Sequence, residues 1–139
     1  MNDTDAIAAL RKQHIDAFNR ADAEGMASSM ADDVIVMPPN IPALEGKQAL
    51  RAWWQGGFDA AQSHFGFTPT ELAIAGDWAF DRFAWTMETT RTSGGEATRD
   101  NGDCVWIWRK GSDGSWLLAR AIWNSDNEAT GIWSGASRD

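Results

Sequence analysis

The sequence lacks several residue types that specific chemistries require. Its 139 residues include no tyrosine, one cysteine and two histidines. A single cysteine excludes a disulfide within the chain and a cysteine-rich zinc site. His14 and His64 are 50 residues apart, and Cys104 forms no metal-site spacing with either of them. Because there is also no glycine-rich phosphate loop after a strand and no GxSxG nucleophile motif, we expect neither a metal nor another cofactor.

Basic residues and long apolar runs are also scarce. Twelve Lys and Arg residues stand against twenty Asp and Glu residues, which gives a net charge of −8. Such a chain repels phosphate backbones and anionic membrane surfaces, so we expect neither nucleic acid nor a membrane as partner. The N-terminus, MNDTDAIAAL, lacks the basic start and apolar run of a secretory signal, and no apolar run approaches the length of a membrane span. The sequence therefore predicts a cytoplasmic protein.

Large aromatic side chains are abundant instead. Nine Trp and six Phe residues supply apolar surface, and indole adds a hydrogen-bond donor without an acceptor. Such a set is typical of an apolar cavity or a large apolar interface. The stretch over residues 103–126 reads DCVWIWRK, a GSDGS turn and WLLARAIWNSD, which predicts a β-hairpin.

The predicted hairpin is apolar on both faces. Because side chains alternate along a strand, Cys104, Trp106 and Trp108 share one face, while Val105 and Ile107 share the other. A sheet of this kind must be covered twice, once by the protein's own helices and once by something else, such as a second copy of the chain.

The rest of the pattern places helices before strands. Apolar residues recur at helical spacing over about 4–21 and 46–61, with a short helix between these segments. A strand is expected to end at Pro38, and Gly76 to mark a turn between two later strands. This order predicts a single α+β domain over 1–139, with the helices on one face of a bent sheet.

Two features interrupt this pattern. The pair Gly56-Gly57 is expected to weaken or kink the third helix. The tail, from about 127 to 139, is rich in Gly and Ser and holds one apolar pair, Ile132 and Trp133. We interpret it as a frayed end or an arm.

Four segments carry a family resemblance. In order and spacing, AFNRADAEGMASSMADDVIVMPP, ALEGKQALRAWW, AGDWAFDR and WLLARAIWNSD resemble the SnoaL-like and ketosteroid-isomerase-like proteins of the nuclear-transport-factor-2-like superfamily. The resemblance implies a cone-shaped α+β barrel, in which a curved, mostly antiparallel sheet wraps around a long N-terminal helix, with two further helices, and encloses an apolar pocket. It also implies homodimers formed through the outer sheet face. The fold hosts isomerases, dehydratases, hydrolases, cyclases and non-catalytic association domains.

The resemblance also implies individual site residues. The general-base Asp of ketosteroid isomerase falls on Pro38, so that base is missing. The oxyanion-hole Tyr falls on His14, which can still donate a hydrogen bond. The second oxyanion donor, a protonated Asp, falls on Cys104 or, after a slip of one residue, on Asp103.

Ligand-binding candidates follow from the alternation of side chains along the strands and from the family resemblance. Alternation places Trp106 and Trp108 on one face of the first hairpin strand, and Ala119, Ala121 and Trp123 on one face of its partner. Small Ala beside large Trp leaves room for a ligand, although plain core and interface packing accounts for at least half of the Trp residues. The resemblance adds an aromatic position on the third helix. The candidates are Phe18, Trp54, Arg82, Cys104, Trp106, Trp108, Ala121 and Trp123.

The catalytic candidates are His14 and Asp103. His14 lies on the apolar stripe of the first helix, and is either a core histidine with satisfied nitrogens or a general acid, general base or orienting donor in a cavity. His64 is expected at the surface or rim. Arg82 follows Asp81 in an apolar strand, where the sequence favours a cross-strand ion pair over binding of a substrate carboxylate.

Two functions are consistent with these residues. The leading hypothesis is a cofactor-free isomerase, lyase or hydrolase that acts on a small steroid-, polyketide- or aromatic-like molecule, with His14 as the polar contact. The alternative is a non-catalytic ligand-binding or dimeric association domain, which the proline at position 38 supports. A pair of polar groups converging in the cavity would favour the enzyme, whereas His14 alone would favour binding.

A homodimer is expected through the outer sheet face. That face would otherwise expose an apolar patch larger than soluble monomers usually show, and the tail around Ile132 and Trp133 is the alternative cover. The side chains predicted to face outward are Val105, Ile107, Leu118 and Ile122, joined by Phe83 and Trp85 depending on strand register.

Overall fold

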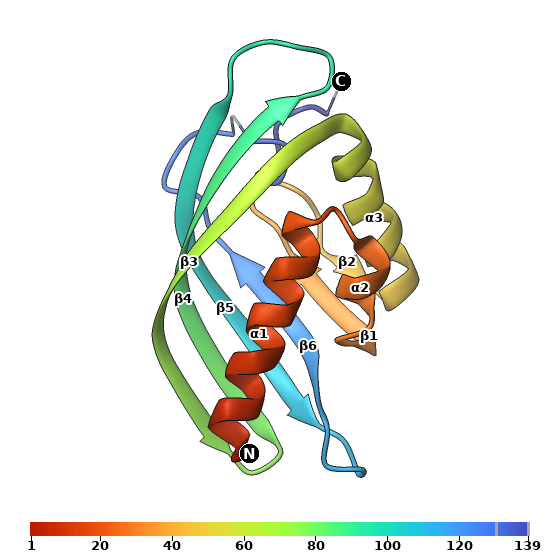
Figure 1. Cartoon of the computed structure of the whole chain (residues 1–139), viewed down its shortest axis with the longest axis vertical. Coiled ribbons are helices and arrows are strands. Elements are labelled where there is room, and N and C mark those ends of the chain that lie inside the picture. The colour runs from red at the N-terminus through yellow and green to blue at the C-terminus, as the bar shows by residue number, and fades with distance from the viewer. Residues whose placement is uncertain (130, 139) are drawn as a thin grey trace.

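The long N-terminal helix α1 (Asp3–Asn19) lies across the concave side of a curved sheet (Figure 1). The computed structural model describes residues 1–129 and 131–138. Of the two shorter helices, α2 (Ala23–Ala27) lies beside α1, and α3 (Lys47–Ala60) lies beside α2 (Figure 1). The predicted order of helices before most of the strands is therefore confirmed.

The first two helices begin at polar N-caps. The side chain of Asn2 accepts a hydrogen bond from the backbone N–H of Asp5 at 2.8 Å, and that of Asp22 accepts one from Gly25 at 2.9 Å. These bonds satisfy donors that the first helical turn leaves free. Helix α3 follows Gly46, whose φ of 94° lies in the region that favours glycine.

Six strands form one sheet in the order β2-β1-β6-β5-β4-β3. All neighbouring strands are antiparallel except β1 and β6, which are parallel. The sheet curves around α1 and stays open, with β2 and β3 at its edges (Figure 1). This architecture confirms the α+β fold with a curved, mostly antiparallel sheet around the first helix. The strands are β1 (Met30–Met37), β2 (Leu44–Glu45), β3 (Ala61–Ala75), β4 (Trp78–Arg91), β5 (Thr98–Lys110) and β6 (Trp116–Trp123).

Strand β3 spans 15 residues. It begins at Ala61, includes the mixed segment QSHFGFTPT and ends at Ala75. Pro69 is accommodated because β3 is an edge strand and its register shifts between Pro69 and Glu71. The turn at Gly76 joins β3 to β4 as predicted.

One extra residue in β6 changes which side chains face inward. The register of β5 and β6 shifts between Ile107 and Trp108, which leaves Ala119 without an opposite residue on β5. Such a bulge interrupts strict alternation. Leu118 therefore pairs with Trp108 and is buried, so the prediction that Leu118 faces outward is wrong.

A buried ion pair fastens α1 to the sheet. Arg11 donates from Nε and Nη2 to the two carboxylate oxygens of Asp81, each at 2.9 Å, and the side chains are 8% and 0% exposed. The indole N–H of Trp108 also donates to Asp81, at 3.3 Å. Arg82, on the outer face, forms a cross-strand ion pair with Glu71 at 2.8 Å. The sequence favoured an ion pair for Arg82, but it did not identify Arg11 of α1 as the partner of Asp81.

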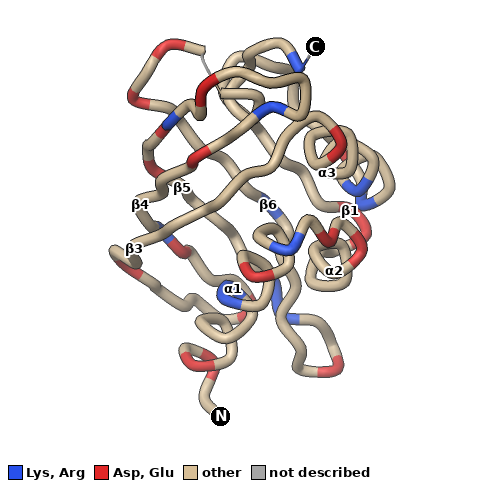
Figure 2. The backbone as a smooth tube through the Cα atoms, turned by 45° about the horizontal axis from the view of Figure 1, so that its top comes forward, with Lys and Arg blue, Asp and Glu red and all other residues tan. Residues whose placement is uncertain are grey.

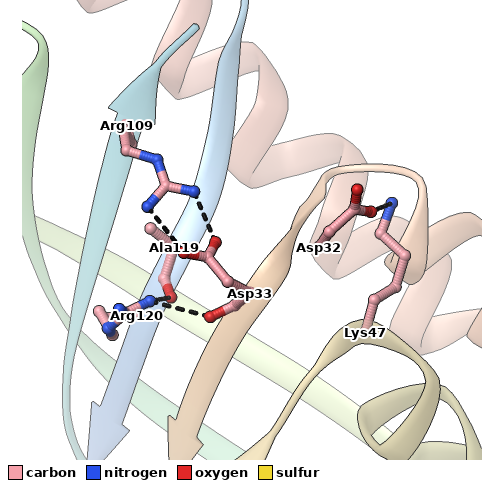
Figure 3. A network of polar contacts seen from close by, with 6 residues as sticks. All are labelled: Asp32, Asp33, Lys47, Arg109, Ala119 and Arg120. Carbon is pink, nitrogen blue, oxygen red and sulfur yellow. Dashed lines mark hydrogen bonds and ion pairs between the residues drawn. The ribbon is translucent and has the colours of Figure 1, made fainter.

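A second polar network ties β1 to its neighbours (Figure 3). Arg109 on β5 donates to the carboxylate of Asp33, and Arg120 on β6 donates to the Asp33 carbonyl at 3.1 Å. Lys47 at the start of α3 lies 3.5 Å from Asp32. These contacts link the parallel β1–β6 pair to β5 and to α3.

Charged residues of both signs are scattered over the fold (Figure 2). The core beneath them is apolar, with Trp108, Phe83 and Leu50 among the side chains that are fully buried. Within the described part of the chain, no helix is both long and apolar enough to cross a membrane.

The C-terminal segment, residues 131–138, folds back onto α3. Ile132, Trp133 and Ser134 are buried, and Arg138 donates a hydrogen bond to the backbone carbonyl of Trp53 at 2.7 Å. This placement differs from the frayed end or arm that the Gly- and Ser-rich composition suggested, because a large indole side chain finds an apolar site.

The ion pair generates a prediction about stability. We expect Arg11→Met to lower the free energy of unfolding by about 3–5 kcal/mol in urea titrations, because the Asp81 carboxylate stays buried without its cation. The double variant Arg11→Met/Asp81→Leu should recover much of the loss. Arg82→Met, which removes the half-exposed pair with Glu71, should change the value by less than about 1 kcal/mol. A double variant less stable than Arg11→Met alone would contradict this account.

Candidate functional site

A cavity lies between the helices and the inner face of the sheet. Its volume of about 50 Å³ holds a few water molecules but no aromatic molecule, since a cavity that binds benzene measures about 150 Å³. Its wall is almost entirely apolar and aromatic. Seven of the predicted site residues line it: His14, Phe18, Trp54, Cys104, Trp106, Ala121 and Trp123.

Three predicted residues lie elsewhere. Asp103 is exposed and points away from the cavity, because the strand register puts Cys104 on the inner face. Arg82 lies on the outer face, where it pairs with Glu71. Trp108 faces inward but packs beside Asp81 and does not line the cavity. The inclusion of Asp103 and Arg82 in one site with His14 is therefore corrected.

His14 brings a titratable imidazole ring to the cavity wall. It is 3% exposed, and its Nδ1 lies 2.8 Å from Ser29 Oγ, which in turn donates to the Met26 carbonyl at 3.0 Å. Because a carbonyl only accepts, the hydroxyl proton lies on that second bond, and Ser29 accepts from Nδ1–H of His14. This tautomer leaves Nε2 with a lone pair, and Nε2 makes no hydrogen bond within the described part of the chain.

Burial sets the charge of this histidine. Desolvation lowers the pKa of His14 from 6.5 to about 4. The ring is therefore neutral at neutral pH, and its basicity is close to that of an ordinary Asp carboxylate, whose pKa is about 3.9. Its Nε2 can accept a hydrogen bond or a proton from a molecule in the cavity.

Trp54 contributes a second unpaired polar atom. Its indole N–H is buried and has no hydrogen-bond acceptor among the described residues. The ring is fixed by Phe18, in an edge contact at 5.7 Å, and by Trp123, stacked at 6.2 Å. A buried donor without an acceptor costs about 1–3 kcal/mol, which makes it a candidate contact for a ligand oxygen.

Cys104 is not a nucleophile in this environment. It is buried, and desolvation raises the pKa of its thiol well above the ordinary value. The thiolate is the reactive and metal-binding form, so a thiol kept protonated contributes only packing. Among the described residues, no group of three His, Cys, Asp or Glu side chains could hold a metal ion, and no carboxylate lines the cavity.

Sequence reasoning missed several residues of the site. Ser29 orients His14, but it lies in a short polar run with no periodicity to indicate its direction. Trp133 lines the cavity from the tail, whose composition suggested an arm. Phe83 and Trp85, whose direction was left open, both face inward.

Comparisons with known proteins agree on the fold. A family model described as SnoaL-like domain matches residues 12–119. A ketosteroid isomerase-like protein from Erwinia carotovora atroseptica SCRI1043 superposes with a TM-score of 0.82 at 28% identity, over 91% of this chain and 99% of that one. A conserved protein from Planctomyces limnophilus DSM 3776 gives a TM-score of 0.81 at 25% identity, over 88% and 97% of the two chains.

A more distant likeness shows the fold alone. A provisionally assigned scytalone dehydratase from Novosphingobium aromaticivorans DSM 12444 superposes with a TM-score of 0.80 at 15% identity, over 89% of this chain and 84% of that one. No curated protein shows significant sequence similarity to this chain.

The lowered pKa of His14 predicts a pH-dependent stability. The unfolded chain binds the His14 proton below about pH 6.5, whereas the folded chain binds it only below about pH 4. The free energy of unfolding should therefore fall as the pH drops through this window, by about 1.4 kcal/mol per pH unit and about 3 kcal/mol in total.

Urea titrations between pH 7 and pH 5 measure this loss, above the range where most carboxylates titrate. In this interval His14→Gln should flatten the pH dependence, while His64→Gln, at an exposed position, should leave it unchanged. An equal slope in wild type and His14→Gln would show that His14 is not buried in its neutral form.

Proposed function

Because this chain belongs to the SnoaL-like domain family, we propose that it binds a small apolar molecule with a hydroxyl or carbonyl group at the internal cavity. The observation that carries the proposal is the presence of two unpaired polar atoms, Nε2 of His14 and Nε1 of Trp54, in an otherwise apolar wall. The first accepts a hydrogen bond from a ligand hydroxyl, and the second donates to a hydroxyl or carbonyl oxygen. Steroid-, polyketide- and aromatic-like molecules have this chemistry, and the cavity of about 50 Å³ must widen to admit any of them.

The proposed reaction is an isomerase- or dehydratase-type proton transfer without a cofactor. The resemblance puts Pro38 at the position of the ketosteroid isomerase general base, and Pro38 does not line this cavity. A neutral His14, whose pKa is about 4, is the base that the cavity wall offers instead. Nε2 would take the proton from a carbon beside the ligand carbonyl, and the Trp54 N–H would stabilise the oxygen on which negative charge develops. The names of two structural relatives, a ketosteroid isomerase-like protein and a provisionally assigned scytalone dehydratase, point to isomerase and dehydratase chemistry on this fold.

Binding without turnover is the second candidate. No carboxylate among the described residues lines the cavity, so nothing compensates a protonated His14 there. An uncompensated charge in an apolar site is costly, which favours hydrogen bonding by His14 over full proton transfer. Ligand affinity that depends on His14, without conversion of the ligand, would identify a binding protein.

We predict that each polar contact adds a measurable part of the affinity. The probes are 4-hydroxyacetophenone, which carries both oxygens, and 4-ethyltoluene, which carries none, with binding followed by NMR of the indole N–H signals. Trp54→Phe and His14→Phe should each weaken binding of 4-hydroxyacetophenone by roughly 2- to 10-fold, the effect of one net hydrogen bond. Binding of 4-ethyltoluene should change little. Trp78→Phe, on the exposed outer face, serves as the control. Equal losses for both probes would remove the proposed polar recognition.

We also propose a homodimer formed through the outer sheet face. Trp78, Phe80 and Ile122 are 46%, 37% and 45% exposed, and Phe80 pairs with Ile107 in neighbouring strands. These side chains share the outer face with Arg82, Arg109 and Arg120, and exposed apolar side chains gathered on one face favour an interface in soluble proteins. A twofold axis would bury the same face on both subunits.

A charge in that face should split the dimer. We expect Ile122→Lys to be monomeric by analytical ultracentrifugation at micromolar concentration, because the ammonium group would be buried unpaired between subunits. Ile74→Lys replaces a residue of similar exposure, 37%, near the end of the edge strand β3, and should remain dimeric. A monomeric wild-type protein would overturn the proposal.

A further inference from the structure

Trp133 fills the space that a ligand of this cavity would need. The indole is 3% exposed and belongs to the cavity wall, although it comes from the C-terminal segment and not from a helix or strand. It packs against Phe18 at 5.3 Å, Trp54 at 5.0 Å and Phe58 at 5.6 Å between ring centroids. Its N–H donates to Ser63 Oγ at 3.0 Å. The ring is therefore held as an aromatic ligand would be, by faces and edges of other rings and one polar contact.

Helix α3 is shaped to receive this ring. A Cβ added to Gly57 would collide with the Cη2 and Cζ3 atoms of Trp133, so only glycine leaves room for the indole. Glycine weakens a helix interior, yet α3 continues through Gly56 and Gly57 to Ala60. The helix gives up intrinsic stability where the tail docks.

The docked tail leaves polar groups unsatisfied. Arg138 lies over the rings of Trp53 and Trp133, at 4.4 and 4.9 Å, but its Nη2 is buried and has no hydrogen-bond partner among the described residues. The buried N–H of Trp54 is also unpaired. Both groups would gain partners if the tail withdrew and water or a ligand oxygen took its place. The docked tail is thus not fully optimised for stability, and water or a ligand can replace it.

We propose that residues 131–138 form an autoinhibitory plug, that Trp133 occupies part of the ligand site, and that a flat bicyclic aromatic ligand displaces it. The inference deepens the proposed function and rests on it. With Trp133 docked, the remaining 50 Å³ excludes even a single aromatic ring. With it withdrawn, the cavity and the aromatic cage around the indole form one continuous site that reaches His14 and Trp54.

Two hydrogen bonds, which we call the latch, hold residues 131–138 in place and so set the fraction of molecules in which the plug is open. Ser134 Oγ donates to Asp100 at 2.6 Å, and Arg138 donates to the Trp53 carbonyl at 2.7 Å. Because only open molecules bind ligand, the apparent affinity is reduced by the fraction that is open. Weakening the latch should therefore tighten binding, whereas a purely structural tail would only lose stability.

The test uses 2-naphthol as the probe, titrated by calorimetry into the full chain. Trp133→Ala should bind it at least tenfold more tightly than wild type, and Ser134→Ala/Arg138→Ala about threefold to tenfold more tightly. Arg99→Ala, which removes an exposed ion pair with Glu88 on the same sheet, should bind like wild type. Because Trp133→Ala can fail to fold, the latch variant carries the same comparison with the aromatic cage intact.

A second measurement follows the indole itself. In wild type labelled with 5-fluorotryptophan, the fluorine signal that Trp133→Phe removes should move to a solvent-exposed position at saturating 2-naphthol. The plug is overturned if folded Trp133→Ala or the latch variant binds no more tightly, or if wild type binds the probe while this signal stays in place. If the plug variants gain affinity but Trp54→Phe and His14→Phe have no effect, the plug stands and the proposed polar recognition fails.

Discussion

The buried ion pair between Arg11 and Asp81 determines where α1 sits, and the cavity depends on that position. Arg11, His14 and Phe18 are three and four residues apart, so they lie on one face of the helix. When the bidentate pair holds Arg11 against β4, the same face directs His14 and Phe18 into the space under the curved sheet. Because a charge buried without its partner is strongly unfavourable, the pair specifies this docking more than it stabilises the fold.

The cavity wall contains polar groups that lack hydrogen-bond partners. Desolvation keeps His14 neutral, the Trp54 N–H has no acceptor among the described residues, and Nε2 of His14 has no donor there. Ordinary cores avoid such groups, whereas functional sites tolerate them because a ligand supplies the missing partner. The hydroxyl of Ser29 matters in this respect, since it fixes the His14 tautomer that turns a lone pair, not a proton, toward a ligand.

Local patterns predicted the elements, and long-range contacts decided the rest. Alternation in β5 assigned Cys104 and Trp106 to the inner face correctly, because the strand is regular there. It failed for Leu118, since a single bulged residue in β6 reverses the alternation and leaves no mark in composition. The partner of Asp81 could not be predicted because Arg11 is 70 residues away in the sequence. Trp133 was missed for a related reason: a polar, Gly-rich segment has no periodicity, and one indole decides its place.

The position of Trp133 also bears on the outer face of the sheet. Two covers for that face were conceivable from the sequence, a second copy of the chain or the tail. The structure places the Trp133 indole inside, among Phe18, Trp54 and Phe58, so the tail completes the inner layer and is not free to cover the outer one. Trp78, Phe80 and Ile122 consequently remain between 37% and 46% exposed in the single chain. With the tail held in the inner layer, covering the outer face is left to the second copy of the chain that we propose.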